Sequence, residues 1–283
     1  MDRRAFVSAV LLALAPAGPL RAATDPADVI ALGGAVTEIV FALGQGHRLL
    51  ARDTTSTYPA AASDLPDVGY LRRLSAEGVL SYAPSLIVSA EGAGPPEVVD
   101  ILRAASVEFT EVPDGYDADA IVEKIRRVGA ALGVSARAEA LIAATRAALA
   151  KATSEAARDE AARKRVMFIL STQGGRIMAS GTATGADGII RMAGGTNAIS
   201  SFVGYKPLSD EAAAAAAPDV ILMMDRGGDH SATDDELFAL PALAVTPAAE
   251  TRSVVRMNGL LLLGFGPRTA QAVRQLNQEL YRG

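Results

Sequence analysis

The 283-residue chain contains no cysteine. This absence excludes a disulfide framework, thiolate chemistry and an iron–sulfur cluster. Histidine is scarce as well, because only His47 and His230 occur, and a zinc or manganese site built from several histidines is not expected. Stability must therefore come from packing, and the 50% of apolar residues in a chain of this length can form the cores of two ordinary domains.

Common enzyme signatures are also missing. The sequence has no Gly-x-x-x-x-Gly-Lys-Ser/Thr phosphate loop, no Gly-x-Ser-x-Gly elbow and no Gly-x-Gly-x-x-Gly that opens a helix. Gly33-Gly34 resembles a dinucleotide turn only weakly. An exported enzyme that uses Glu91 and Asp225 as acid and base stays an alternative, since their separation is not given by the sequence.

The N-terminus has the features of an export signal in residues 1–23. Arg3 and Arg4 form a basic start, an apolar run follows in residues 6–14, and Leu20-Arg21-Ala22 resembles a small-residue cleavage site. The apolar run is too short to span a bilayer. The paired arginines also fit a twin-arginine signal, so the Sec and twin-arginine routes both stay open, and either leads out of the cytoplasm.

The mature chain is predicted to be acidic. Removal of residues 1–23 takes away three Arg and one Asp, and the net charge falls from −5 to −7. Such acidity argues against nucleic acid or an anionic membrane as a partner.

One sequence motif occurs in two similar copies. The first copy is Gly69-Tyr70-Leu71-Arg72-Arg73-Leu74-Ser75-Ala76-Glu77, and the second is Gly204-Tyr205-Lys206-Pro207-Leu208-Ser209-Asp210-Glu211. In both copies a Leu-Ser-x-Glu helix start is followed, seven residues after the Glu, by a Pro that ends the helix and precedes an apolar strand. The repeat predicts two similar lobes.

Short apolar runs alternate with helical patterns through both halves of the chain. Strands are expected at residues 28–32, 48–51, 86–89, 166–170 and 220–224, and helices at 36–43, around 188–192 and at 267–280. This alternation predicts parallel sheets with helices on both faces. Residues 136–163 lack Gly and Pro and carry charges at helical spacing, which predicts one long helix.

The predicted fold is therefore α/β: two Rossmann-like parallel-sheet lobes, residues 28–134 and 164–283, bridged by a long α-helix in residues 135–163. Ligands of open parallel sheets collect at the carboxyl ends of the strands. We expect one cleft between the lobes, lined by the loops at Gly33, Tyr70, Glu91, Thr172 and Arg226.

Tyr70 is the first candidate ligand-binding residue. It lies on a turn and not in a periodic core stripe, and although most loop tyrosines are surface rings, Arg72 and Arg73 beside it would favour the phenolate over the phenol. A phenolate oxygen is a hard ligand for ferric iron, and tyrosine is a known axial ligand of haem.

Arg226 is the second candidate. It directly follows the expected strand of the second lobe, where its guanidinium could form paired hydrogen bonds to a carboxylate, or alternatively pair with Asp225 or Asp229. His230 lies on the same loop and is a candidate second metal ligand, whereas His47 is interpreted as a solvated turn residue.

Glu77 and Glu211 occupy equivalent places in the two repeats, in the first turn of an expected helix. A carboxylate there interacts favourably with the helix dipole and can complete a cap with Ser75 or Ser209. Capping explains both residues, but matching carboxylates on two lobes would also suit docking to a partner with approximate two-fold symmetry.

Several motifs together resemble the periplasmic haem-binding proteins of bacterial haemin ABC importers, which serve iron uptake and belong to the wider class of solute-binding proteins for vitamin B12, siderophores and haem. The resemblance covers essentially the whole mature chain. Its motifs are residues 36–44, 52–56, Leu65-Pro66-Asp67-Val68-Gly69-Tyr70, 90–96, Gly204-Tyr205-Lys206-Pro207-Leu208-Ser209 and Gly264-Phe265-Gly266-Pro267-Arg268.

The resemblance implies a monomeric periplasmic carrier that binds ferric haem b and passes it to an inner-membrane ABC permease with its ATPase subunits, without chemistry. It implies that Tyr70 is the axial ligand, that Arg72 supports it, that Arg226 contacts the propionates, and that Glu77 and Glu211 dock to arginines of the permease.

One departure from the family pattern concerns further haem ligation. Some relatives have a histidine in the first loop of the second lobe, where this chain has Leu170-Ser171-Thr172-Gln173-Gly174-Gly175, so a sixth ligand or a second stacked haem is in doubt. A ferric siderophore or a corrinoid on the same scaffold, with Tyr70 as a stacking ring, is the alternative ligand.

Overall fold

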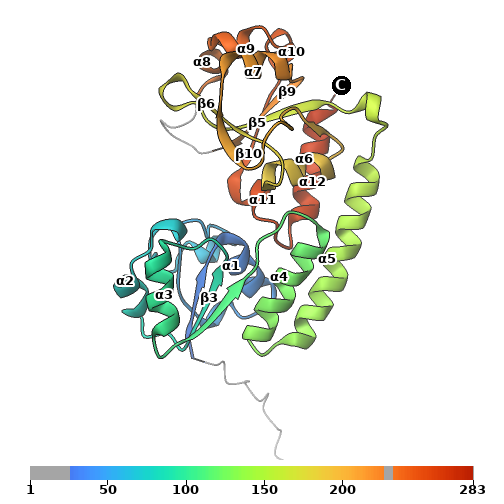
Figure 1. Cartoon of the computed structure of the whole chain (residues 1–283). Helices are drawn as coiled ribbons and strands as arrows, with labels where there is room; N and C mark the ends of the chain where they lie inside the picture. The colour runs from blue at the N-terminus through green and yellow to red at the C-terminus, as the bar shows by residue number, and fades with distance from the viewer. Residues whose placement is uncertain (1–25, 226–231, 283) are drawn as a thin grey trace, which may run out of the picture.

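The computed structural model describes residues 26–225 and 232–282. Figure 1 shows two α/β lobes, one above the other, with a long helix along one side of both. The predicted signal in residues 1–23 and the predicted ligand-binding residues Arg226 and His230 lie outside the described residues. Within the described part of the chain, no helix combines the length and apolar character needed to cross a membrane.

The N-terminal lobe has a four-stranded, all-parallel sheet in the order β2-β1-β3-β4. Its strands are β1 (Val29–Leu32), β2 (Leu49–Arg52), β3 (Leu86–Ala90) and β4 (Glu108–Val112). Alternate residues of β1 pack on opposite faces, Val29 and Ala31 towards α1 (Gly34–Ala42) and α4 (Ala118–Ala131), Ile30 and Leu32 towards α2 (Ala76–Leu80) and α3 (Pro96–Ala104). The prediction of a parallel sheet covered on both faces is confirmed for this lobe.

The C-terminal lobe has a mixed sheet in the order β10-β9-β5-β6-β8, with the short strand β7 also paired to β5. Its strands are β5 (Arg165–Ser171), β6 (Ile177–Ser180), β7 (Thr196–Asn197), β8 (Tyr205–Leu208), β9 (Val220–Asp225) and β10 (Val254–Asn258). Strands β5, β9 and β10 are parallel, but β6 and β8 are antiparallel. The predicted all-parallel second sheet is wrong here, because the five-residue connection after β5 is too short for a parallel crossover.

Helices cover both faces of this second sheet as well. One face packs against α6 (Gly185–Met192), α11 (Gly259–Leu263) and α12 (Thr269–Leu280), on the side towards the other lobe. The opposite face packs against α7 (Asp210–Ala216), α8 (Asp234–Phe238), α9 (Pro241–Ala244) and α10 (Pro247–Glu250).

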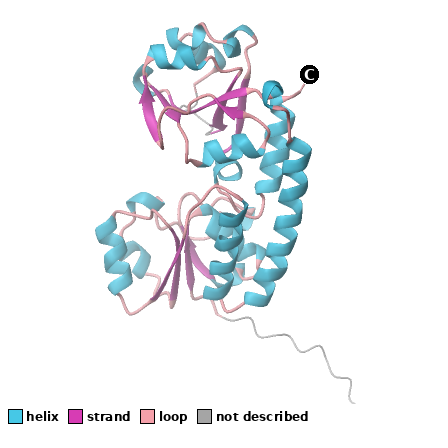
Figure 2. Cartoon of the chain, turned by 45° about the vertical axis from the view of Figure 1, so that its right-hand side comes forward, coloured by secondary structure: helices cyan, strands magenta, loops and turns pink. Residues whose placement is uncertain are grey.

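The connecting helix α5 (Ser135–Ala156) contacts α4 of one lobe and α12 of the other, and Figure 2 shows this long helix along one side of both lobes. It was predicted to continue to about Arg163, but it ends at Ala156, and a 3-10 turn (Glu160–Ala162) follows before β5. The carbonyl of Ala156 accepts a hydrogen bond from Asn277 of α12, and Gly194 lies directly against it. The last carbonyl of this helix is thus hydrogen-bonded by a residue far away in the chain, so the local sequence does not show where the helix ends.

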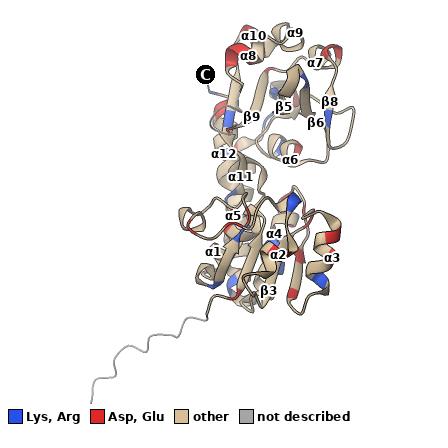
Figure 3. Cartoon of the chain, turned by 90° about the vertical axis from the view of Figure 1, so that its left-hand side faces the viewer, with Lys and Arg blue, Asp and Glu red and all other residues tan. Residues whose placement is uncertain are grey.

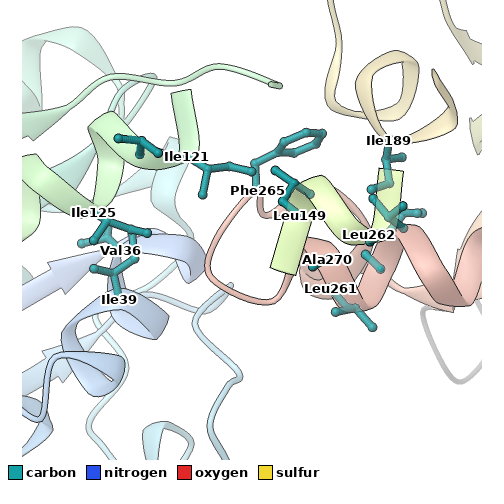
Figure 4. Close-up of a cluster of buried hydrophobic side chains, with 14 of the residues drawn as sticks. Val36, Ile39, Ile121, Ile125, Leu149, Ile189, Leu261, Leu262, Phe265 and Ala270 are labelled. Carbon is teal, nitrogen blue, oxygen red and sulfur yellow. The ribbon is translucent and has the colours of Figure 1, made fainter. Parts of the chain in front are cut away.

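A single apolar core runs from one lobe into the other. It contains side chains of β1, α1 and α4, of the connecting helix, and of β5, α6, α11 and α12. Phe265, between α11 and α12, is only 1% exposed and packs edge-on against Tyr116 of the N-terminal lobe, with ring centroids 5.4 Å apart. Figure 4 shows Phe265 between Ile121 of α4 and Leu262 of α11, so its ring bridges the two halves of the core.

Candidate ligand-binding cleft

A cavity of about 480 Å³ lies between the lobes, at the carboxyl ends of parallel strands. The N-terminal lobe contributes Gly33 to Val36, Arg72, Glu91 and the loop after β4, and the C-terminal lobe contributes Asp225 and the beginning of α11. The cleft predicted from the strand ends is therefore present. Thr172 is not among its lining residues, because the chain turns back after β5 into the antiparallel strand β6.

Gly33 brings the start of α1 to the cleft. Its φ of 110° is unfavourable for residues with a side chain, and a Cβ would lie 2.7 Å from the Cβ of Ala90. Its N–H donates to the Oδ1 of Asp53 at 2.8 Å, and this fully buried carboxylate also accepts from Thr55 and Ser56. The buried carboxylate of Asp53 thus fixes the turn between β1 and α1, and the glycine at this turn presents only backbone to the cleft.

Tyr70 directly precedes the 3-10 turn Leu71–Arg73, whose residues Leu71 and Arg72 line the cleft, but Tyr70 itself is not among the lining residues. The N–H of Gly94 donates to the carbonyl of Leu71, and the N–H of Leu74 donates to the carbonyl of Gly94, so two loops support each other. The Tyr70 side chain is 46% exposed, and its hydroxyl has no hydrogen-bond partner among the described residues. Its oxygen is therefore available to a ligand.

Tyr205 is the repeat equivalent of Tyr70, but its surroundings differ. It lies on the edge strand β8 and packs edge-on against Phe168, with ring centroids 6.2 Å apart. Although Tyr205 is 38% exposed as a residue, partial desolvation of its phenol raises its pKa, and hydrogen bonds to its oxygen from Thr184 and from the N–H of Ala186 oppose this. The Tyr205 hydroxyl thus already has protein partners, so the two tyrosines of the repeat are not equivalent sites.

Arg72 lines the cleft, and among the described residues its guanidinium has no hydrogen bond or ion pair. It lies close enough to Tyr116 and Tyr205 to act on both phenols electrostatically. An exposed guanidinium without a protein partner can form paired hydrogen bonds with an anionic ligand group. Of the two predicted residues, Arg72 therefore lines the cleft, and the exposed Tyr70 precedes it by two residues.

A network in the loop after β4 was not predicted from the sequence. The carboxylate of Asp114 accepts from the Nζ of Lys124 at 2.7 Å and from the hydroxyl of Tyr116 at 3.0 Å. Burial opposes the ionisation of Asp114, but the Lys124 ammonium prevails and lowers its pKa. Burial also raises the pKa of Tyr116 to about 12, helped by the Asp114 carboxylate. The loop that carries this network directly follows a fourth strand, and that position was the one signal that could have identified it from the sequence.

Glu91 and Asp225, the carboxylates of the enzyme alternative, both line the cleft. The Oε2 of Glu91 accepts the backbone N–H of Asp114 at 2.8 Å, so Glu91 braces the loop after β4. In residues 26–225 and 232–282 no group of three or more histidine or acidic side chains could hold a metal ion.

Glu77 and Glu211 are both exposed in the first turns of α2 and α7, which belong to different lobes (Figure 3). Ser75 and Ser209 cap these helices by accepting the N–H of Gly78 and of Ala212. The backbone N–H of Glu211 and the Ser209 hydroxyl lower the pKa of the Glu211 carboxyl. The serines thus make the caps, and both carboxylates remain accessible at the surface.

Comparison with known proteins places the chain in a family. Residues 29–259 match the profile described as "Periplasmic binding protein". The apo structure of the periplasmic heme-binding protein RhuT from Roseiflexus sp. RS-1 is 40% identical, with a TM-score of 0.87, over 91% of this chain and 99% of that one. The periplasmic heme-binding protein BhuT in complex with two hemes is 41% identical, with a TM-score of 0.85, over 89% and 97%.

A more distant sequence relative is an uncharacterized ABC transporter substrate-binding lipoprotein of Bacillus subtilis, 23% identical over 91% of this chain and 81% of its own length. The profile match covers most of the chain, and the two solved structures share its two-lobed architecture over almost their whole length. The chain belongs to the periplasmic binding protein family.

Proposed function

We propose that this protein is a periplasmic carrier that captures ferric haem in the cleft between its lobes and delivers it to an ABC permease in the inner membrane. The observation that carries the proposal is the loop of Tyr70 and Arg72: Arg72 lines the cleft without an ion pair among the described residues, and Tyr70, two residues earlier, is exposed. Relatives about 40% identical over nearly the whole chain are heme-binding proteins, which supports haem as the ligand.

The chemistry of the cleft suits a porphyrin. Its walls include apolar side chains against which a macrocycle can pack: Val36, Leu71, Val112, Met224, Leu260 and Leu263. Its volume of about 480 Å³ falls within the range of small-molecule sites. Tyr70 would supply a single oxygen ligand to the iron and Arg72 would stabilise the phenolate or bind a propionate. We assign Arg226 to the propionates and keep His230 as a candidate second ligand.

Delivery requires that haem is released from the cleft without being chemically changed. A single oxygen ligand in an open cleft holds haem, but lets it leave when a partner separates the walls. We propose that Glu77 and Glu211, one exposed carboxylate on each lobe, dock to arginines of the permease. Export would use the signal in residues 1–23, by the Sec or the twin-arginine route, and the carrier would act as a monomer.

The test is a titration of the metal-free mature protein with ferric haem, followed by visible absorption. We expect a saturable, high-spin spectrum of the tyrosinate type that is lost in Tyr70→Ala and retained in the matched control Tyr205→Ala. A spectrum lost in Tyr205→Ala and retained in Tyr70→Ala would assign the ligand to the other repeat. Absence of saturable haem binding would reject haem, and titrations with a ferric siderophore and a corrinoid would then test the alternative ligands.

A further inference from the structure

A buried ion pair joins the two lobes. Arg268, at the start of α12 in the C-terminal lobe, donates from Nη2 and Nε to the Oε2 of Glu38 at 2.8 and 3.0 Å. Its backbone N–H donates to the Oε1 of Glu38 at 3.1 Å. Glu38 lies on α1 of the N-terminal lobe, and its side chain is only 6% exposed, against 20% for Arg268. Both carboxylate oxygens therefore bind across the lobe boundary.

Tyr58 covers this ion pair from the N-terminal lobe. Its ring centroid lies 3.3 Å from the guanidinium carbon of Arg268, which places the cation directly over the aromatic face. The guanidinium is thus held by a carboxylate and a ring of one lobe, while its backbone belongs to the other. We call Glu38, Tyr58 and Arg268 the interlobe clamp.

The interlobe clamp is continuous with the walls of the cleft. Glu38 lies on the helix whose first residues, Gly34 to Val36, form part of one wall. Arg268 follows shortly after Leu263 and Gly264, which belong to the opposite wall. These walls already touch at one point, since a Cβ at Gly34 would collide with the side chain of Leu260. Movement of one wall away from the other must therefore stretch or break the Arg268–Glu38 pair.

Breaking this pair is costly, because it would leave a nearly buried carboxylate without its cation. Walls that are held in place before the ligand arrives also reduce the ordering cost of binding and slow dissociation. We propose that Glu38, Tyr58 and Arg268 are positioning residues that set the width of the cleft and thereby the residence time of its ligand. The statement about residence time rests on the proposed haem function, whereas the statement about cleft width does not.

The first experiment measures the separation of the lobes in the haem-free protein. The mature chain has no cysteine, so spin labels attach only to introduced ones, and the exposed residues Ile101 on α3 and Val245 beyond α9 accept Ile101→Cys and Val245→Cys. Pulsed dipolar spectroscopy should give a narrow distance distribution for the otherwise unchanged chain. Arg268→Gln should broaden this distribution and shift it.

The matched control is Arg48→Gln, which removes a two-pronged Arg–carboxylate pair to Asp28 within one lobe. It should leave the distance distribution unchanged. An unchanged distribution in Arg268→Gln, or equal broadening in Arg48→Gln, would overturn the interlobe clamp. If Arg268→Gln does not fold, Tyr58→Leu retains the ion pair and removes the covering ring, and it should broaden the distribution to a smaller extent.

The second experiment measures haem dissociation by transfer to excess apomyoglobin. Arg268→Gln and Glu38→Gln should each release haem about tenfold faster, a difference that corresponds to about 1.4 kcal/mol, and the double variant should be no faster than either. The visible spectrum should not change, because Tyr70 is untouched. Unaltered dissociation would refute the role in residence time. If the unmodified protein does not bind haem, the proposed ligand fails while the distance measurement still decides the interlobe clamp.

Discussion

Phe265 is the side chain through which the two lobes share one core, and its truncation tests that continuity. Its ring is 1% exposed, packs on Tyr116, and lies next to Gly185 and Gly188 of α6. Replacement of a fully buried Phe by Ala typically destabilises a protein by about 3–5 kcal/mol. Phe265 has a φ of 49°, but Ala carries the same Cβ, so the backbone strain is similar in both and the loss reports packing.

The assay is urea unfolding followed by a fluorophore on one lobe at a time, since the chain has no tryptophan. Labels at Ile101→Cys and Val245→Cys report on the N-terminal and C-terminal lobes respectively. We expect coincident transitions at both labels, displaced to lower urea by about 3 kcal/mol or more in Phe265→Ala. Phe109→Ala, which truncates a partly buried ring packed against a separate cluster of the N-terminal lobe, is the matched control and should cost less.

Two results would refute this reasoning. A loss below about 1 kcal/mol in Phe265→Ala would mean that the ring contributes no more than an ordinary surface contact. Separate transitions at the two labels in the unmodified protein would mean that the lobes unfold independently and that the shared core does not couple their unfolding.

Three further predictions concern charges. The double variant Glu77→Lys, Glu211→Lys should leave haem affinity unchanged and abolish stimulation of the permease ATPase in reconstituted vesicles. Retained stimulation would mean that both residues act only at the ends of their own helices and do not dock to the permease. In an absorbance titration at alkaline pH, Tyr116 should ionise at about pH 12, and Tyr116→Phe should remove that step. The lowered pKa of Asp114 stabilises the folded protein above pH 3.8, the ordinary pKa of the group, and this stabilisation is lost as the pH falls through the folded value. In Lys124→Met, the free energy of unfolding should therefore depend less steeply on pH in the acid range. An unchanged slope would contradict the Lys124–Asp114 pairing.

The elements that were predicted correctly have local signals. Strand β1 is a short apolar run that ends in two glycines, and α2 and α7 begin at Leu-Ser-x-Glu and end before a proline. Side-chain periodicity and backbone restriction by Gly and Pro act over a few residues, so they are visible in one dimension. The repeat of this pattern was enough to predict two α/β lobes and a cleft between them.

The mistaken predictions share another cause. The antiparallel strands β6 and β8 and the end of α5 at Ala156 depend on which segments meet in space. Tyr70 and Tyr205 have similar sequence neighbours, but the hydroxyl of Tyr205 is engaged by Thr184 and the N–H of Ala186, at the start of α6. A motif therefore identified a pair of tyrosines and could not distinguish them.

The sequence by itself determined the strands β1, β2, β3, β5 and β9, the two lobes, and the presence of Tyr70 and Arg72 on one loop, because these follow from local periodicity and turn chemistry. The tertiary structure alone decided that Arg268 pairs with Glu38, that Tyr116 rests on Asp114 and Phe265, and that the Tyr70 hydroxyl faces no partner within the described residues. Such contacts join residues that are far apart in the chain, and their energy depends on burial and direction, which no local pattern encodes.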